Sequence, residues 1–164
     1  MRVNEYSIGE YGALVLCARE LGIPVIFAAG EEAFCREAQD LTPGVITAAV
    51  KRGTLPDDHS REITVEQYAK SKLGANHMSP AGARQLLRKQ AQNAMETYFS
   101  SREQFRYREI HAPYALLQEM RASDNVPEKT AIRQTTSFNS FIEAINCLIN
   151  TPFDDIISKR TEIV

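Results

Sequence analysis

The chain has 164 residues, of which 43% are apolar and 24% are charged, a composition typical of one globular domain and not of a disordered protein. The 19 basic and 21 acidic residues are well mixed and leave a formal charge of −2, which argues against a nucleic-acid partner. No apolar run approaches the ~18 residues that a membrane helix needs, and the N-terminal MRVNEYSIGEYG lacks the apolar core of a signal peptide.

Cysteine usage favours a reducing compartment. Cys17, Cys35 and Cys147 each lie singly in an apolar stretch, without the spacing of a metal site or a redox motif. We therefore expect each of them to be a small buried apolar residue. A cytoplasmic location fits this pattern.

The first predicted helix runs from Glu10 to Leu21, after a short strand over residues 1–8 that ends at Gly9. One face of this helix carries apolar residues three or four positions apart, namely Leu14, Cys17, Ala18 and Leu21. Three neighbours widen that face, namely Ala13, Val15 and Leu16. The helix should therefore be largely buried.

Two strands and a second helix are predicted next. Gly22 caps the first helix, and the continuous apolar run IPVIFAAG over residues 23–30 is typical of a central strand in a parallel sheet. Residues 31–41 predict a helix that begins with two acids, and residues 45–50 predict another strand. The order strand, helix, strand, helix, strand within residues 1–52 predicts right-handed crossovers on a mainly parallel sheet.

A long helix begins after the loop-rich residues 53–78, which are read either as loop with some helix or as an extended arm. Ser79 followed by Pro80 is a typical helix start, with a capping side chain and a first-turn proline. The apolar face of this helix consists of Ala83, Leu86, Leu87, Ala91, Ala94 and Tyr98.

Residues 105–121 predict one or two strands, broken near Pro113, with which residues 130–135 could pair. A last helix is predicted over residues 138–149. Its cap would be Ser137 and its apolar stripe Phe138, Ile142, Ile145 and Ile149. Residues 151–164 are read as a solvated tail.

We therefore expect a single domain over residues 1–164 of the α/β class. The predicted architecture is a three-layer sandwich with a mainly parallel sheet in the N-terminal half. A small mixed or antiparallel strand region and a helix would be added in the C-terminal half.

A catalytic or metal-binding cluster is hard to find in this sequence. The three histidines, His59, His77 and His111, are far apart and none has the spacing that places two imidazoles on one helical face. Asp57 and Asp58 precede His59 directly, which is most simply a solvated turn. Glycine-rich phosphate loops are also absent. A metal site built by this chain alone is therefore not expected.

Glu10 is the one residue whose setting invites a functional interpretation. It lies between two glycines in IGEYG, at a strand-to-helix turn, and such turns are where α/β folds collect ligands. The simpler interpretation is an acid in the first turn of a helix, favoured by the helix dipole. The residues alone leave both interpretations open.

The segment from residue 8 to 53, IGEYGALVLCARELGIPVIFAAGEEAFCREAQDLTPGVITAAVKRG, resembles the zinc-dependent D-aminopeptidase family. In that family a glycine and a glutamate open a helix, an apolar strand ends in a glycine with two acids, and a cysteine is followed by basic and acidic residues. The similarity continues more weakly through GANHMSPAGARQLL and FRYREIHAP and covers most of residues 3–150. The matching stretch is the C-terminal portion of the family's subunit.

The resemblance implies an α/β fold, assembly of subunits into rings, and two zinc ions that activate water to remove an N-terminal D-amino acid from short peptides. It assigns the role of zinc ligand to Glu10 and to no other residue. The family's other ligands and its catalytic histidine precede the glycine-glutamate motif, whereas only nine residues precede Glu10 here and none is histidine or aspartate. Since zinc sites take about four ligands, this chain alone should not hold zinc.

Two functions remain, besides a chance resemblance. In the first, the chain is part of a split or truncated D-aminopeptidase that acts on short D-amino-acid-containing peptides, as a homo-oligomeric ring or with a complementing N-terminal chain. In the second, it is a non-catalytic relative with a structural, oligomerising or small-molecule-binding role. A half-protein should expose strand edges and an apolar face where the missing sheet would pack, whereas a self-sufficient protein should cover them or make them polar.

Overall fold

The computed structural model describes residues 1–54, 66–67, 69–70, 74–120, 131–152 and 154–155. These residues form two compact units, each of which is described by itself. Unit 1 takes its described residues from Met1–Ser7, Asp57–Lys70 and His111–Val164, and unit 2 takes them from Ile8–Pro56 and Ser71–Ile110. No helix in the described residues is both long enough and apolar enough to cross a membrane.

Unit 2 is built on a three-stranded sheet in the order β3-β4-β5. The strands β3 (Phe27–Glu31) and β4 (Ile46–Gly53) are parallel, and β5 (Ala75–His77) pairs antiparallel with the end of β4. The strand β3 begins later than the apolar run, because the backbone N–H of Val25 donates to the Tyr107 hydroxyl (3.0 Å) and not to a neighbouring strand.

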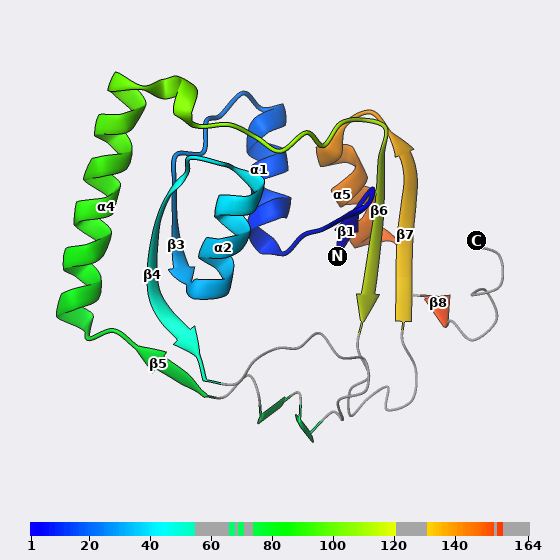
Figure 1. The fold of residues 1–164 in the computed structure, drawn as a ribbon. Coiled ribbons are helices and arrows are strands. Elements are labelled where there is room, and N and C mark those ends of the chain that lie inside the picture. The colour runs from blue at the N-terminus through cyan, green and yellow to red at the C-terminus, as the bar shows by residue number, and fades with distance from the viewer. Residues whose placement is uncertain (55–65, 68, 71–73, 121–130, 153, 156–164) are drawn as a thin grey trace. The chain divides into compact units, whose positions relative to one another are not determined.

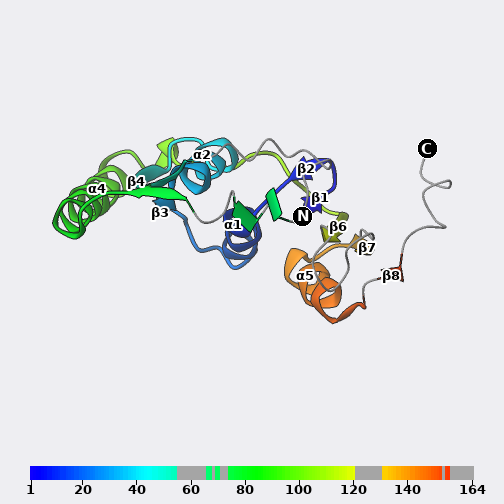
Figure 2. The same cartoon turned by 90° about the horizontal axis from the view of Figure 1, so that it is seen from below.

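The described part of unit 2 also contains the helices α1 (Glu10–Glu20), α2 (Glu32–Leu41) and α4 (Pro80–Ser100), the last followed by the short helix η1 (Arg102–Gln104). Both α2 and α4 pack against β3 and β4, whereas α1 packs against α2. In Figures 1 and 2, α4 lies on one side of the strands, and α1 and α2 lie on the other.

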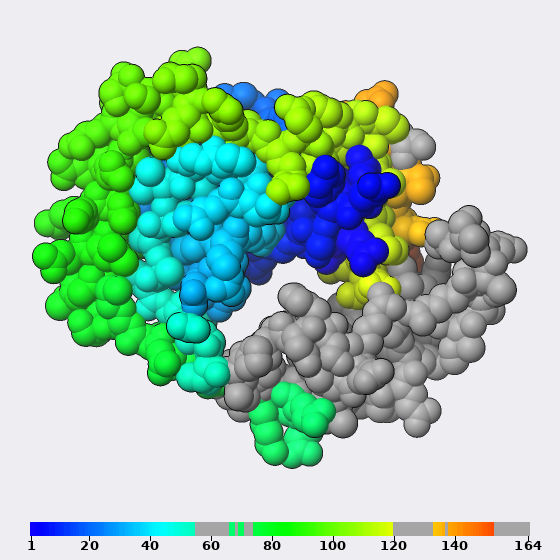
Figure 3. Space-filling view, in the orientation of Figure 1, coloured from blue at the N-terminus to red at the C-terminus, as the bar shows by residue number. Residues whose placement is uncertain are grey.

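The start of α4 is as predicted. The Ser79 hydroxyl accepts a hydrogen bond from the N–H of Gly82 (3.2 Å), and Pro80 occupies the first turn. In α4 only Ala94 is fully buried, and the predicted apolar face is otherwise half-buried. In the space-filling view the outer surface of α4, in green, lies open along the helix (Figure 3).

The helix α1 buries only part of the face that we predicted, namely Val15 and Leu16. Its buried residues are Tyr11, Gly12, Val15 and Leu16. Leu14 and Leu21, which belong to the most apolar face, are 68% and 64% exposed. The prediction that α1 is largely buried is therefore wrong for that face, because α1 packs beside α2 through the Tyr11 side and has no comparable packing on a described strand.

Unit 1 contains a five-stranded sheet in the order β2-β1-β6-β7-β8, in which every pairing is antiparallel. Its strands are β1 (Arg2–Val3), β2 (Tyr6–Ser7), β6 (Tyr114–Met120), β7 (Ala131–Phe138) and β8 (Asp154–Asp155). The pairing of β6 with β7 confirms part of the prediction for this region, but residues 105–113 form no strand, so β6 begins only after Pro113.

Residues 1–8 do not form the first strand of the parallel sheet, so that prediction is wrong. They turn at Asn4, which has a positive φ of 51°, and Val3 pairs with Leu116 of unit 1. The Asn4 side chain fixes the turn, because it accepts a hydrogen bond from the N–H of Ala115 (2.9 Å) and donates one to the His111 carbonyl (3.1 Å).

The last helix, α5 (Phe141–Asn150), starts three residues later than predicted. Ser140, not Ser137, is the cap, and its hydroxyl accepts a hydrogen bond from the N–H of Glu143 (3.1 Å). The predicted Phe138 is instead the last residue of β7. The buried stripe is Phe141, Ala144 and Leu148.

The cysteine prediction holds only in part. Cys35 is buried and Cys17 is half-buried, but Cys147 is exposed because it lies on α5 away from the buried stripe. Most of the predicted loop-rich region and of the tail, and the whole of Asp57–His59, lie outside the described residues.

Candidate functional site

Glu10 is the first residue of α1 and its side chain is exposed. The first backbone N–H groups of a helix have no partner within the helix, so other groups must satisfy them. The preceding residue, Gly9, is extended and has no side chain to do so. The site is therefore an open helix start with one carboxylate beside it.

Glu37 of α2 supplies the missing cap of α1. Its Oε1 accepts hydrogen bonds from the N–H groups of both Gly9 (2.6 Å) and Gly12 (3.0 Å). A carboxylate at this end of a helix is also favoured by the helix dipole. Glu37 is therefore the acid that stabilises the start of α1, and Glu10 is not needed for that role.

The two glycines of the motif allow this close approach. A Cβ atom at Gly12 would lie 2.5 Å from the Cβ of Ile8 and 3.0 Å from Oε1 of Glu37, and one at Gly9 would lie 2.7 Å from Oε2 of Glu37. Such separations are shorter than van der Waals contact, so a larger residue would push the helix start away from Glu37. The glycines that flank Glu10 thus have a packing role.

A buried hydrogen bond holds α1 against the end of α2. The Tyr11 hydroxyl donates to Oγ1 of Thr42 (2.8 Å), and the Tyr11 ring packs edge-on against Phe34 with ring centroids 5.5 Å apart. Burial raises the pKa of Tyr11 to about 12. Tyr11, the residue next to Glu10, is therefore neutral and held in place. Its contacts fix the backbone that carries the exposed Glu10 carboxylate.

Glu10 has no set of further metal ligands in the part of the chain that the structure describes. No group of three or more histidine, cysteine, aspartate or glutamate side chains that could hold a metal ion occurs there. Of the histidines, His77 lies in β5 and is exposed, and His59 is not among the described residues. Because zinc takes about four ligands, the described residues do not fit a zinc ion by themselves.

The two acids at the junction of β3 and α2 are engaged in ion pairs. Glu32 contacts Arg36 (3.1 Å) and Arg52 (3.1 Å), and Glu31 contacts Lys51 (3.7 Å). All five side chains are more than a third exposed, so these pairs stabilise the fold only slightly. They connect α2 and β3 to the end of β4 and leave no spare carboxylate pair there.

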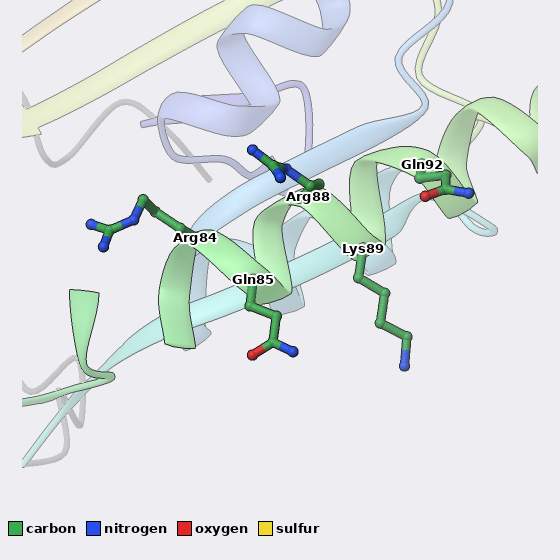
Figure 4. Close-up of a pocket in the computed structure, with 5 residues that line it drawn as sticks. All are labelled: Arg84, Gln85, Arg88, Lys89 and Gln92. Atoms are coloured by element: carbon green, nitrogen blue, oxygen red, sulfur yellow. The ribbon is translucent and has the colours of Figure 1, made fainter. Parts of the chain in front are cut away.

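A hollow on α4 is lined by Arg84, Gln85, Arg88, Lys89 and Gln92. Figure 4 shows that these side chains all come from one helix and point in different directions. They therefore do not converge on a common point, as the groups of a binding site do.

A smaller crevice of about 240 Å³ lies where the ends of α1, α4 and η1 meet. One of its two arginines, Arg19, donates to the carbonyl oxygens of Arg108 (3.2 Å) and Ile110 (3.3 Å), with its guanidinium 5.7 Å from the Tyr107 ring centre. These contacts hold the segment after η1 against α1, so Arg19 has a structural role.

The family of the chain follows from a comparison with known proteins. A family model described as D-aminopeptidase matches residues 1–140. The chain belongs to the D-aminopeptidase family. Glu10 and the helix start around it lie within the matched residues.

Two members illustrate the extent of the similarity. A D-aminopeptidase of Bacillus subtilis (strain 168) is 38% identical over 50 residues, which are 30% of this chain and 18% of that protein. A solved structure, described as the Zn-dependent D-aminopeptidase DppA from Bacillus subtilis, a self-compartmentalizing protease, has the same fold, with a TM-score of 0.61 at 18% identity. The similarity covers 93% of this chain and 55% of that one, so this D-aminopeptidase-family chain spans about half the length of its solved relative.

Proposed function

We propose that this chain is the portion of a D-aminopeptidase-family hydrolase that carries the glycine-glutamate motif. In this proposal Glu10 is one zinc ligand, and a complementing polypeptide supplies the others. The observation that carries the proposal is the setting of Glu10: an exposed carboxylate, on a rigid helix start, whose capping role is already filled by Glu37.

The completed hydrolase would remove an N-terminal D-amino acid from short peptides, in the cytoplasm and as a homo-oligomeric ring. Membership of the D-aminopeptidase family supports the reaction, and the self-compartmentalizing relative supports an assembly of subunits. Unit 2 would then be part of a larger three-layer sandwich whose sheet continues into the complementing polypeptide. The chain by itself is expected to be inactive.

A second function, that of a non-catalytic relative, is favoured by a different observation. The part of the chain that the structure describes holds no group of side chains able to bind a metal ion. A structural or small-molecule-binding protein would have no need of one. A protein of this kind would not require a second polypeptide near Glu10. The two proposals therefore differ in whether such a polypeptide is needed for function.

The test measures bound zinc and hydrolysis of a D-alanyl anilide. The purified chain alone should retain no zinc and show no turnover. With the complementing polypeptide present, zinc-dependent and chelator-sensitive turnover should appear and should be lost in Glu10→Gln. The matched control Glu20→Gln, at the other end of α1, should keep it. Turnover that Glu10→Gln leaves unchanged would contradict the role of Glu10, and the absence of turnover would favour the non-catalytic function.

A further inference from the structure

We propose that one face of α1 and the outer edge of β3 together seat the complementing polypeptide, which adds a strand parallel to β3. This face, called the α1 face below, consists of Leu14, Cys17, Ala18 and Leu21. The inference rests on the proposed function, because it names where the partner of that function binds.

The α1 face is apolar and exposed at both ends, with the half-buried Cys17 and Ala18 between them. Leu14 and Leu21 are 68% and 64% exposed, and Ile23, just after the helix, is 53% exposed. Single exposed apolar residues are common on protein surfaces, but a stripe of them along one helix face marks an interaction surface. The spacing of this stripe is that of a helix face that packs against another layer.

The outer edge of β3 is open in the described part of unit 2. The strand lies at the end of the order β3-β4-β5. The N–H of Ile46 donates to the Ile26 carbonyl (3.1 Å), so by alternation the peptide groups of Phe27 and Ala29 point away from β4. This edge carries none of the charged residues, prolines or bulges that blunt edge strands until Glu31, where the register shifts. On this side β3 therefore has the features of an interior strand, which normally pairs with a second neighbouring strand.

The position of α1 indicates where that neighbour would lie. In Figures 1 and 2, α1 lies beyond β3 on the side away from β4. It packs on α2 and has no comparable packing on any described strand. A strand added to the edge of β3 would therefore lie beside α1. Because IPVIFAAG is apolar throughout, as strands between two parallel neighbours are, the added strand is expected to be parallel.

Two observations identify the occupant as a complementing polypeptide. The match to the solved relative covers 93% of this chain but only 55% of that one, so a further stretch of the relative has no counterpart in the residues compared. Glu10 lies four residues before Leu14 and hence on the α1 face, in the series 10, 14, 17, 21. A polypeptide seated there would bring its own side chains next to Glu10.

The experiment uses the polypeptide encoded directly upstream of this chain, supplied as a separate chain and mixed with the full chain described here. Binding is measured by calorimetry without zinc or substrate, and residue-level hydrogen exchange is followed by NMR. We expect binding to protect the amides of Phe27 and Ala29. Leu14→Lys with Leu21→Lys should weaken binding at least tenfold, whereas Phe99→Lys, a change at a 78% exposed apolar residue of α4, should not.

Each outcome decides the inference. Absence of binding, binding without protection at β3, or binding unaffected by the two lysines would overturn it. A dimer of this chain that the lysines dissociate, seen by light scattering, would assign the α1 face to a second copy instead. Circular dichroism of the free variants shows whether they fold, as expected for exposed positions. A complex at this surface without hydrolysis would contradict only the proposed function, and hydrolysis by a complex formed elsewhere would contradict only the docking surface.

Discussion

Replacement of Glu37 by alanine tests whether this side chain, and not Glu10, stabilises the start of α1. The change removes the acceptor of two backbone N–H groups, those of Gly9 and Gly12. Water can replace it at the exposed Gly9, but Gly12 is buried and its N–H would lose its partner. An unsatisfied buried donor costs about 1–3 kcal/mol, and the lost charge at the helix dipole costs about 0.5 kcal/mol more.

We therefore expect Glu37→Ala to lower the free energy of unfolding by about 1.5–3.5 kcal/mol. Glu37→Gln keeps one acceptor oxygen and should cost about 0.5–1 kcal/mol. Urea unfolding followed by circular dichroism measures both, and the slope with urea should not change, since the native fold is kept. Glu10→Ala is the control and should change stability by less than ~0.5 kcal/mol, as exposed substitutions do. A larger loss in Glu10→Ala than in Glu37→Ala would refute the assignment of the cap.

Three further predictions follow from the same structure. Burial raises the pKa of Tyr11 to about 12, against 10 in the unfolded chain. The free energy of unfolding should therefore be constant with respect to this group below pH 10. It should fall by about 1.4 kcal/mol per pH unit as the pH rises from 10 to 12. The free energy of unfolding of Tyr11→Phe, measured between pH 10 and 12, should lack this fall. Gly44→Ala should cost more than about 2 kcal/mol, because φ is +92° and the new Cβ would overlap a backbone carbonyl. Gly22→Ala, with φ of +69° and open space, should cost only about 1 kcal/mol, and equal losses in thermal unfolding would contradict this reasoning. In the native protein a disulfide reagent should modify the exposed Cys147 rapidly. It should react with Cys35, whose pKa is raised by burial, only on unfolding. Equal rates of modification would contradict the assignment of Cys147 as exposed and Cys35 as buried.

Local signals in the sequence predicted the elements that depend on nearby residues. Ser79 with Pro80 fixed the start of α4, and the apolar run before Gly30 with the run after Gly44 predicted the parallel pair. The sheet that residues 1–8 join could not be predicted from such local signals. Their partner, Leu116, lies more than a hundred residues away, and a strand of two residues has too little alternation to show which sheet it joins.

The candidate site shows the same limit. Its glycine-glutamate pattern is visible in the sequence, but the cap of α1 is not, since Glu37 is 25 residues from Gly12 and looks like any acid of an amphipathic helix. Helix periodicity identified the apolar α1 face but predicted its burial wrongly, because periodicity does not show whether another element covers a face. The two serines near α5 offer equal capping chemistry, and only the end of β7 at Phe138 decides between them.

The pairing of β1 with β6 governs the order in which the chain can fold during its synthesis. Every strand of unit 2 has been translated before Leu116 leaves the ribosome, whereas Val3 must wait for it. Contacts between such distant segments form slowly, because the intervening loop must first close. Val3 thus gains its partner in β6 late, and in a nascent chain whose exposed part ends near residue 110, β1 would pair with β2 alone.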